Sequence, residues 1–103
     1  MDIGKNILSV LDGFLLAIRQ DARISPAHIS LYLSILQYCK GQGSMLVRVR
    51  REQLAWQAKI STTTYHRCIN QLHEYGYIHY LPSFDPKKAS EVDVLVKSKN
   101  EKK

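Results

Sequence analysis

The sequence predicts a fold of the α+β class, in which four helices accompany a small three-stranded antiparallel sheet. Three observations lead to this prediction. Apolar residues recur every three or four positions in the longer stretches, they alternate with polar residues in the shorter ones, and glycine or proline separates most of these stretches. A chain of 103 residues is expected to form one domain, here residues 1–96, around a single modest core.

Residues 1–43 are expected to form a pair of helices. The first covers residues 2–20, where the apolar side chains from Ile3 to Ile18 recur at helical spacing. Their stripe is wide for a helix that covers only a small core, which suggests that part of it meets another surface.

The second helix of the pair is expected at residues 26–40. Ser25 is a suitable N-cap, Pro26 fits the first helical position, and Gly41 is the expected stop. Apolar residues spread over more than one side of this helix, so we expect it at the centre of the core.

Residues 44–96 are expected to add two helices and three strands in the order strand, helix, helix, strand, strand. The loop 82–90 holds two prolines and the pair Lys87 and Lys88, and the basic tail 97–103, which has no apolar residue, is expected to be disordered. The predicted elements are a strand at 45–49, helices at 51–58 and 61–75, and strands at 77–81 and 91–96.

The stretch 61–75 begins with a serine and three threonines, which are poor in helix interiors but acceptable in a first turn. Ser61 is the expected N-cap, and Gly76 is the expected left-handed residue that ends the helix. Helical periodicity places one set of side chains toward the core, namely Tyr65, Cys68, Ile69 and Leu72. It places a second set outward, namely Thr63, His66, Arg67, Asn70 and Glu74.

Positive charge is concentrated in the second half of the chain. The net charge is +6 and the pI is about 9.5. Residues 1–45 hold four Lys/Arg and three Asp/Glu, whereas residues 46–103 hold eleven and six. The second half is therefore the part expected to meet a polyanion, either nucleic acid or an acidic membrane surface.

The stretch "LAWQAKISTTTYHRCINQLHEYGYI" resembles a winged helix-turn-helix over residues 45–96. It is similar to MarR-type and GntR-type regulators and to small winged-helix proteins of phages, plasmids and mobile elements. The segments "AHISLY" and "TYHRCINQLHEYGYIHYLPS" resemble small Bacteroides-type members of the last group. The matching positions are Leu54, Ala55, Ile60, Ser61, Thr64, Arg67, Leu72, Gly76, Tyr77 and Ile78.

The resemblance implies that the helix 61–75 enters the major groove of double-stranded DNA and that the wing 82–90 touches the backbone. The candidates for base readout are Thr62, Thr63, His66, Arg67 and Asn70. The candidates for backbone contact are Arg48, Arg50, Arg51, Lys59, Lys87 and Lys88. The alternative is that the outer face of the helix 61–75 and the lysines of the loop 82–90 are simply exposed to solvent and bind no ligand.

One position departs from the family pattern. Arg50 and Arg51 stand where a capping hydroxyl or aspartate usually precedes the helix 51–58. Loss of that cap is expected to cost about 1 kcal/mol, and the arginines are expected to contact phosphate instead.

The sequence gives little support for a metal site, a disulfide or a catalytic site. Cys39 and Cys68 are expected to be small buried hydrophobes in a reducing compartment, and His66 and His73 share a helix face without a set of metal ligands. No nucleophile and base stand in a catalytic pattern, so neither an enzyme nor a cofactor is predicted. Without a signal peptide or a membrane-length apolar stretch, the expected location is the cytoplasm.

Aromatic residues outside the core helices allow two readings. Trp56 is expected either to pack under the helix 2–20 or the wing, or to be exposed as a partner or backbone contact. Tyr75, Tyr77 and Tyr80 are expected to pack in the core and the hairpin rather than to stack on bases.

The most specific prediction is a small transcriptional regulator or mobile-element accessory factor. Alternatives are a replication-initiation or excision factor and a protein-interaction module that does not bind DNA. A homodimer through the helix 2–20 is the expected assembly, with a monomer as the alternative, and no small-molecule effector is inferred.

Overall fold

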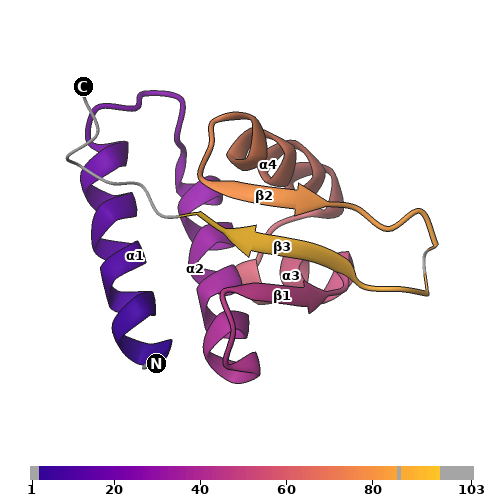
Figure 1. Ribbon diagram of the computed structural model, residues 1–103. Coiled ribbons are helices and arrows are strands. Elements are labelled where there is room, and N and C mark those ends of the chain that lie inside the picture. The colour runs from indigo at the N-terminus through magenta and orange to yellow at the C-terminus, as the bar shows by residue number, and fades with distance from the viewer. Residues whose placement is uncertain (1–2, 86, 96–103) are drawn as a thin grey trace.

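The computed structural model describes residues 3–85 and 87–95 and has the predicted α+β layout (Figure 1). The predicted order of elements is confirmed, and the tail 97–103 lies outside the described residues. The helices are α1 (Ile3–Ile18), α2 (Pro26–Gln42), α3 (Arg51–Ala58) and α4 (Thr62–Glu74), and the strands are β1 (Leu46–Val49), β2 (Ile78–Leu81) and β3 (Ser90–Val94).

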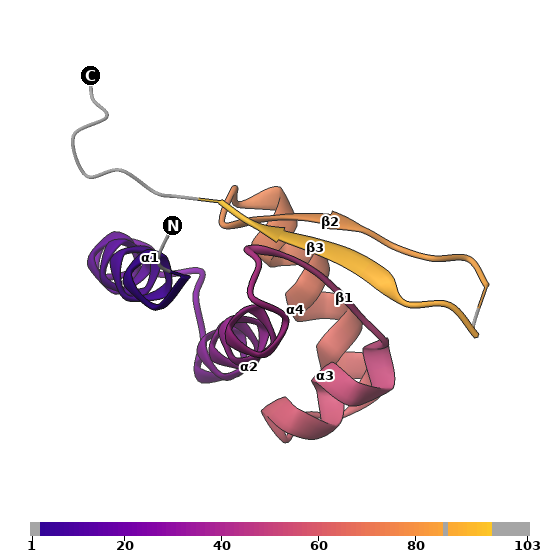
Figure 2. The same cartoon turned by 60° about the horizontal axis from the view of Figure 1, so that its bottom comes forward.

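The sheet is antiparallel throughout, with β3 between β1 and β2. Val47 of β1 lies opposite Val92, and Ile78 of β2 lies opposite Val94. These side chains are buried and alternate with more exposed ones, as the strand periodicity predicted. Figure 2 shows the helices on the inner side of the sheet, so the outer side faces solvent.

Helix α2 lies at the centre of the core, as predicted. It packs against α1, α3, α4 and the sheet, and Leu31, Ile35 and Cys39 along it are completely buried. Phe14 of α1 stacks on Tyr32 of α2 with ring centroids 3.7 Å apart. The edge of Tyr77 contacts the same Phe14 ring at 5.2 Å, so one aromatic group joins α1, α2 and the residue that precedes β2.

The end of α2 differs from the prediction. Gly41 lies inside the last turn, and the helix ends at Gly43, whose φ of 67° is left-handed. The N–H groups of Gly43 and Ser44 both donate to the carbonyl of Cys39. Because Gly43 satisfies this carbonyl while the chain turns toward β1, the second glycine of "GQG" stops the helix and the first does not.

The loop between β2 and β3 is one residue shorter than the predicted wing 82–90. Ser90 is the first residue of β3 and is buried. Its Oγ accepts a hydrogen bond from the N–H of Ser83 (3.1 Å), which closes the loop across its base. The connecting residues are therefore 82–89.

Both cysteines are buried and free, which confirms their reading as small core residues. Burial raises the pKa of the Cys39 thiol to about 11 and also raises the pKa of Cys68. Neither thiol is activated for metal binding or nucleophilic attack.

The aromatic group around Phe14 should dominate the attachment of α1. Replacing Phe14 with alanine should lower the free energy of unfolding by about 3–5 kcal/mol, because a buried ring leaves a cavity. Leu33→Ala, on α2 and 44% exposed, is the matched control and should cost about 1 kcal/mol or less. Urea denaturation followed by circular dichroism measures both, and equal losses would contradict the packing described for Phe14.

Candidate nucleic-acid interface

Helix α4 has the predicted cap and stop. The Oγ of Ser61 accepts a hydrogen bond from the N–H of Thr64 (3.1 Å), and the Ser61 hydroxyl donates to Thr64 Oγ1 (3.0 Å). At the other end, Gly76 adopts a φ of 87° and turns the chain into β2. The hydroxyl-rich stretch is thus a capped first turn.

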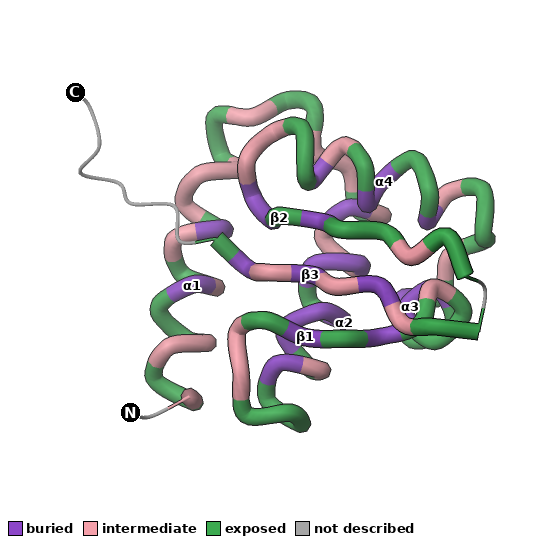
Figure 3. The backbone as a smooth tube through the Cα atoms, turned by 45° about the vertical axis from the view of Figure 1, so that its right-hand side comes forward, coloured by how far each residue is buried: buried purple, intermediate pink, exposed green. Residues whose placement is uncertain are grey.

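The two faces of α4 are divided as predicted (Figure 3). Tyr65, Cys68, Ile69 and Leu72 are fully buried and attach the helix to the core. The opposite face carries all five base-readout candidates, and each is exposed: Thr62, Thr63, His66, Arg67 and Asn70. The Asn70 side-chain amide donates to the carbonyl of His66 (2.7 Å), so it must leave that bond before it can meet another acceptor.

The turn between α3 and α4 is made by a lysine. Lys59 has a φ of 63°, which is uncommon for a residue other than glycine, and its N–H donates to carbonyls at the end of α3. Its Nζ lies 5.1 Å from the centroid of the Trp56 ring, where a cation–π contact holds the charge beside α3.

Trp56 is 73% exposed, so the expectation that it packs under the helix 2–20 or the wing is wrong. Its exposure agrees with the alternative, whose partner or backbone contact stays a prediction. Leu54 and Ala58 take the buried side of α3, which turns Trp56 to solvent. The indole borders an open groove of about 460 Å³ between α2 and α3, whose other lining residues are Tyr38, Arg50, Glu52 and Gln53.

The arginines near the start of α3 are exposed or half-buried. Arg50 and Arg51 lie 3.8 and 3.7 Å from carboxylate oxygens of Glu52. Such surface pairs contribute about 0–1 kcal/mol, so either arginine can exchange Glu52 for a phosphate at small cost.

The missing cap before α3 is partly replaced. Arg50 occupies the N-cap position, and its N–H donates to the side-chain oxygen of Gln53 (3.1 Å). Gln53 thereby supplies half of a capping box, so the full loss expected from the sequence does not apply. The sequence could have predicted this contact, because a glutamine three residues after the N-cap is part of the capping-box motif.

The structure does not place Arg48 with the residues of α4. It lies on the outer side of the sheet, where its Nε is 3.2 Å from Glu91 on the neighbouring strand. Its charge is therefore partly compensated on a surface different from the exposed face of α4.

The hairpin loop carries the remaining two candidates, Lys87 and Lys88, and both are exposed. Asp85 organises this loop, since its carboxylate accepts the Lys87 N–H (2.9 Å) and its carbonyl accepts the Lys88 N–H (3.0 Å). Figures 1 and 3 show the hairpin tip, α3 and the start of α4 toward one end of the molecule, away from α1.

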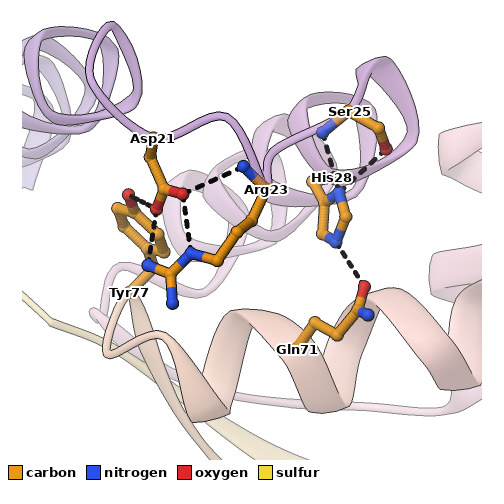
Figure 4. Close-up of polar contacts among 6 residues, drawn as sticks. All are labelled: Asp21, Arg23, Ser25, His28, Gln71 and Tyr77. Carbon is orange, nitrogen blue, oxygen red and sulfur yellow. Dashed lines mark hydrogen bonds and ion pairs between the residues drawn. The ribbon is translucent and has the colours of Figure 1, made fainter.

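A buried histidine joins α2 to α4 and was missed from the sequence (Figure 4). The Nδ1 of His28 accepts the N–H of Ser25 (2.9 Å), so its Nε2 carries the proton that is donated to Oε1 of Gln71 (2.7 Å). His28 is 1% exposed. The position of His28, three residues after the serine N-cap, could have predicted its contact with Ser25. Its contact with Gln71 on α4 could not be predicted from the sequence.

A second polar group joins the loop after α1 to the turn after α4 (Figure 4). Asp21 accepts hydrogen bonds from the Arg23 guanidinium (2.7 and 2.8 Å) and from the Tyr77 hydroxyl (2.6 Å). Arg23 also lies over the Tyr75 ring at 3.8 Å. The Arg23 guanidinium, together with the Tyr77 hydroxyl, holds the pKa of Asp21 well below its ordinary value of 3.8.

Comparison with protein-family models, with curated proteins and with solved structures finds no match to this chain. Within residues 3–85 and 87–95, no three His, Cys, Asp or Glu side chains gather to hold a metal ion. No helix in this described part is long and apolar enough to cross a membrane.

The hydrogen bonds of Asp21 should make the free energy of unfolding depend on pH in the acidic range. Asp21→Asn should lower the free energy of unfolding at neutral pH, because the carboxylate form is the one that its hydrogen bonds stabilise. The difference from wild type should shrink as pH falls below 3.8 toward the depressed folded-state pKa, since protonation of Asp21 removes the contribution from wild type and the asparagine variant lacks it at every pH.

Urea denaturation at a series of pH values measures this difference. Asp12→Asn, which neutralises an exposed carboxylate on α1, is the matched control and should change stability little. A gap between wild type and Asp21→Asn that stays constant down to strongly acidic pH would contradict the role of the charge.

Proposed function

We propose that this protein binds double-stranded DNA without catalysis, with α4 in the major groove and the hairpin loop 82–89 on the neighbouring backbone. The observation that carries the proposal is the exposed face of α4. Five groove candidates share it, while the opposite face of the same helix is fixed in the core. A rigid helix with an exposed polar face at its N-terminal end is the arrangement that helix-turn-helix proteins use.

The side chains of this face suit base edges. Arg67 has the geometry to donate to O6 and N7 of guanine, and the Asn70 amide, once released from the His66 carbonyl, to bridge adenine. Thr62 and Thr63 are short enough to let the helix approach closely. Glu74, near the end of α4, repels phosphate, so contacts should concentrate in the first half of the helix.

Backbone contact is assigned to the lysines of the loop and the arginines of α3. Lys87 and Lys88 are exposed, and Arg50 and Arg51 share only Glu52 as an ion-pair partner among the described residues. If six to ten phosphates are neutralised, affinity should fall about a thousandfold or more between 50 and 200 mM salt.

The biological role within this class follows from the family resemblance. A small transcriptional regulator or a mobile-element accessory factor is our first assignment, and a replication-initiation or excision factor is the alternative. All four act by placing a protein on a particular duplex site, which is the property that the exposed face of α4 supports.

Replacing Arg67 and Asn70 with alanine should abolish preference for one DNA sequence over another while leaving the fold intact, because both side chains are exposed. Loss of a good base contact costs about 1–3 kcal/mol at each position. Selection from a random duplex pool, followed by titration of selected and scrambled duplexes, measures the preference.

Arg19→Ala, which removes an exposed charge just after the end of α1, is the matched control and should keep the preference. Survival of sequence preference in the double variant would show that α4 is not the reading helix. Absence of duplex binding even at low salt would contradict the DNA-binding proposal itself.

A second candidate function is recognition of a protein partner, and the groove beside Trp56 favours it. Trp, Tyr and Arg are the residues most enriched at binding hot spots, and Trp56, Tyr38 and Arg50 line the same groove. If duplex binding is absent, this groove becomes the preferred site.

We further propose that a second copy of this chain covers the exposed leucines of α1. Leu8 is 67% exposed and Leu15, two turns along, is 44% exposed, with Leu11 between them. This seven-residue spacing gives a seam that a like helix can meet. An adjoining groove of about 530 Å³ extends the apolar surface and is lined by Ile3, Gly4, Lys5, Ile7, Leu8 and Lys40.

Replacing both Leu8 and Leu15 with glutamate should convert a dimer into a monomer, because two charges would then have to be buried in the seam. Sedimentation velocity over a range of concentrations measures the assembly. Ser9→Glu adds a charge to an exposed position outside the leucine seam and should leave the dimer intact. Wild-type protein that sediments as a monomer at every concentration would contradict this assembly.

A further inference from the structure

Phe84 is the most exposed large hydrophobic residue in the described chain, with 98% of its surface accessible. It belongs to the loop that joins β2 to β3. This loop forms the end of the hairpin away from α1 (Figure 1). Its ring therefore packs against nothing in the fold. A phenylalanine in full contact with water gains no burial energy in the monomer, so its ring is available to a partner.

The backbone on both sides of Phe84 is ordered by hydrogen bonds. The Ser83 hydroxyl accepts the N–H of Asp85 (3.2 Å) and donates to its carbonyl (3.1 Å), and the Ser83 N–H donates to Ser90. On the far side, Asp85 accepts the N–H groups of Lys87 and Lys88. These hydrogen bonds restrain the described residues on either side of the ring, which lowers the cost of ordering them on binding.

The charges near the ring suit a polyanion. Lys87 and Lys88 follow Phe84 closely and are exposed. Asp85, between Phe84 and these lysines, is also exposed and its carboxylate accepts the Lys87 N–H, so the loop carries a net charge of +1. An exposed ring followed three and four residues later by lysines matches the minor groove, where proteins insert apolar side chains between base pairs while cations meet the flanking phosphates.

We propose that Phe84 inserts between two base pairs in the minor groove beside the segment that α4 reads, and that the protein bends the DNA it binds. This role of Phe84 as a wedge between base pairs rests on the proposed DNA-binding function. It adds a change in the shape of the bound DNA. Unstacking is least costly at pyrimidine–purine steps, so a TA or CA step should lie where the ring enters. Base contacts by α4 and deformation by Phe84 would then select the site together.

The test uses the full chain and the duplex of about 30 base pairs that it selects best from a random pool, labelled with a fluorescent donor and acceptor at its two ends. Wild-type protein should raise energy transfer, because the ends approach when the duplex bends. It should also make one thymine reactive to permanganate, which attacks unstacked thymines.

Phe84→Ala should still bind this duplex, with an affinity loss of about tenfold or less, but should lose both the rise in energy transfer and the permanganate signal. Phe84→Leu should restore most of both, since leucine is also used as a wedge. Leu81→Ala is the matched control, because Leu81 is another exposed apolar residue of this hairpin but lies on the strand. It should behave as wild type.

Binding by the wild type without bending, or bending that persists in Phe84→Ala, would overturn the wedge and leave the DNA-binding proposal standing. Failure to bind any duplex at low salt would overturn both. In that case, sedimentation of the protein with phosphatidylserine vesicles, lost in Phe84→Ala, would assign the ring to a lipid surface instead.

Discussion

Burial of α2 on nearly all of its sides is the constraint on which the other elements depend. Its apolar residues face in several directions, so a stable fold must bring α1, α3, α4 and the sheet around it. Each neighbour then has one face committed to the core and one face free. For α4, the committed face is Tyr65, Cys68, Ile69 and Leu72, and this alone directs the groove candidates outward.

Hydrophobic contact brings α4 onto α2, but two polar groups specify how it lies there. His28 and Gln71 are bonded across the two helices, and Asp21 connects the loop before α2 to Tyr77 just after α4. Apolar surfaces tolerate small slides, whereas hydrogen bonds in a buried site do not, because a displaced partner leaves a polar atom unsatisfied. A helix that reads DNA, as we propose for α4, needs this kind of fixed position.

Several exposed apolar side chains mark surfaces that the monomer leaves uncovered. They lie on three separate elements: Leu8 and Leu15 on α1, Trp56 on α3, and Phe84 in the hairpin loop. The leucines of α1 adjoin further apolar surface, and Trp56 borders a groove with polar and charged residues. Phe84 precedes a pair of lysines. The surfaces proposed for a second copy and for nucleic acid lie on separate elements, whereas the groove beside Trp56 shares Arg50 with the proposed backbone contacts.

Local patterns determined a large part of the fold and of the candidate site. The seven elements, the Ser61 cap, the Gly76 stop and the two faces of α4 all follow from spacings within one helix or strand, where nearest neighbours decide the outcome. The same periodicity predicts the exposure of four of the five base-readout candidates, namely Thr63, His66, Arg67 and Asn70. Only tertiary structure decided the rest. These features depend on segments far apart in the chain: the strand order β1-β3-β2, the exposure of Trp56, the Gln71 partner of His28, the Glu91 partner of Arg48 and the isolation of Phe84. The periodicity within one segment does not encode which distant surface that segment will meet.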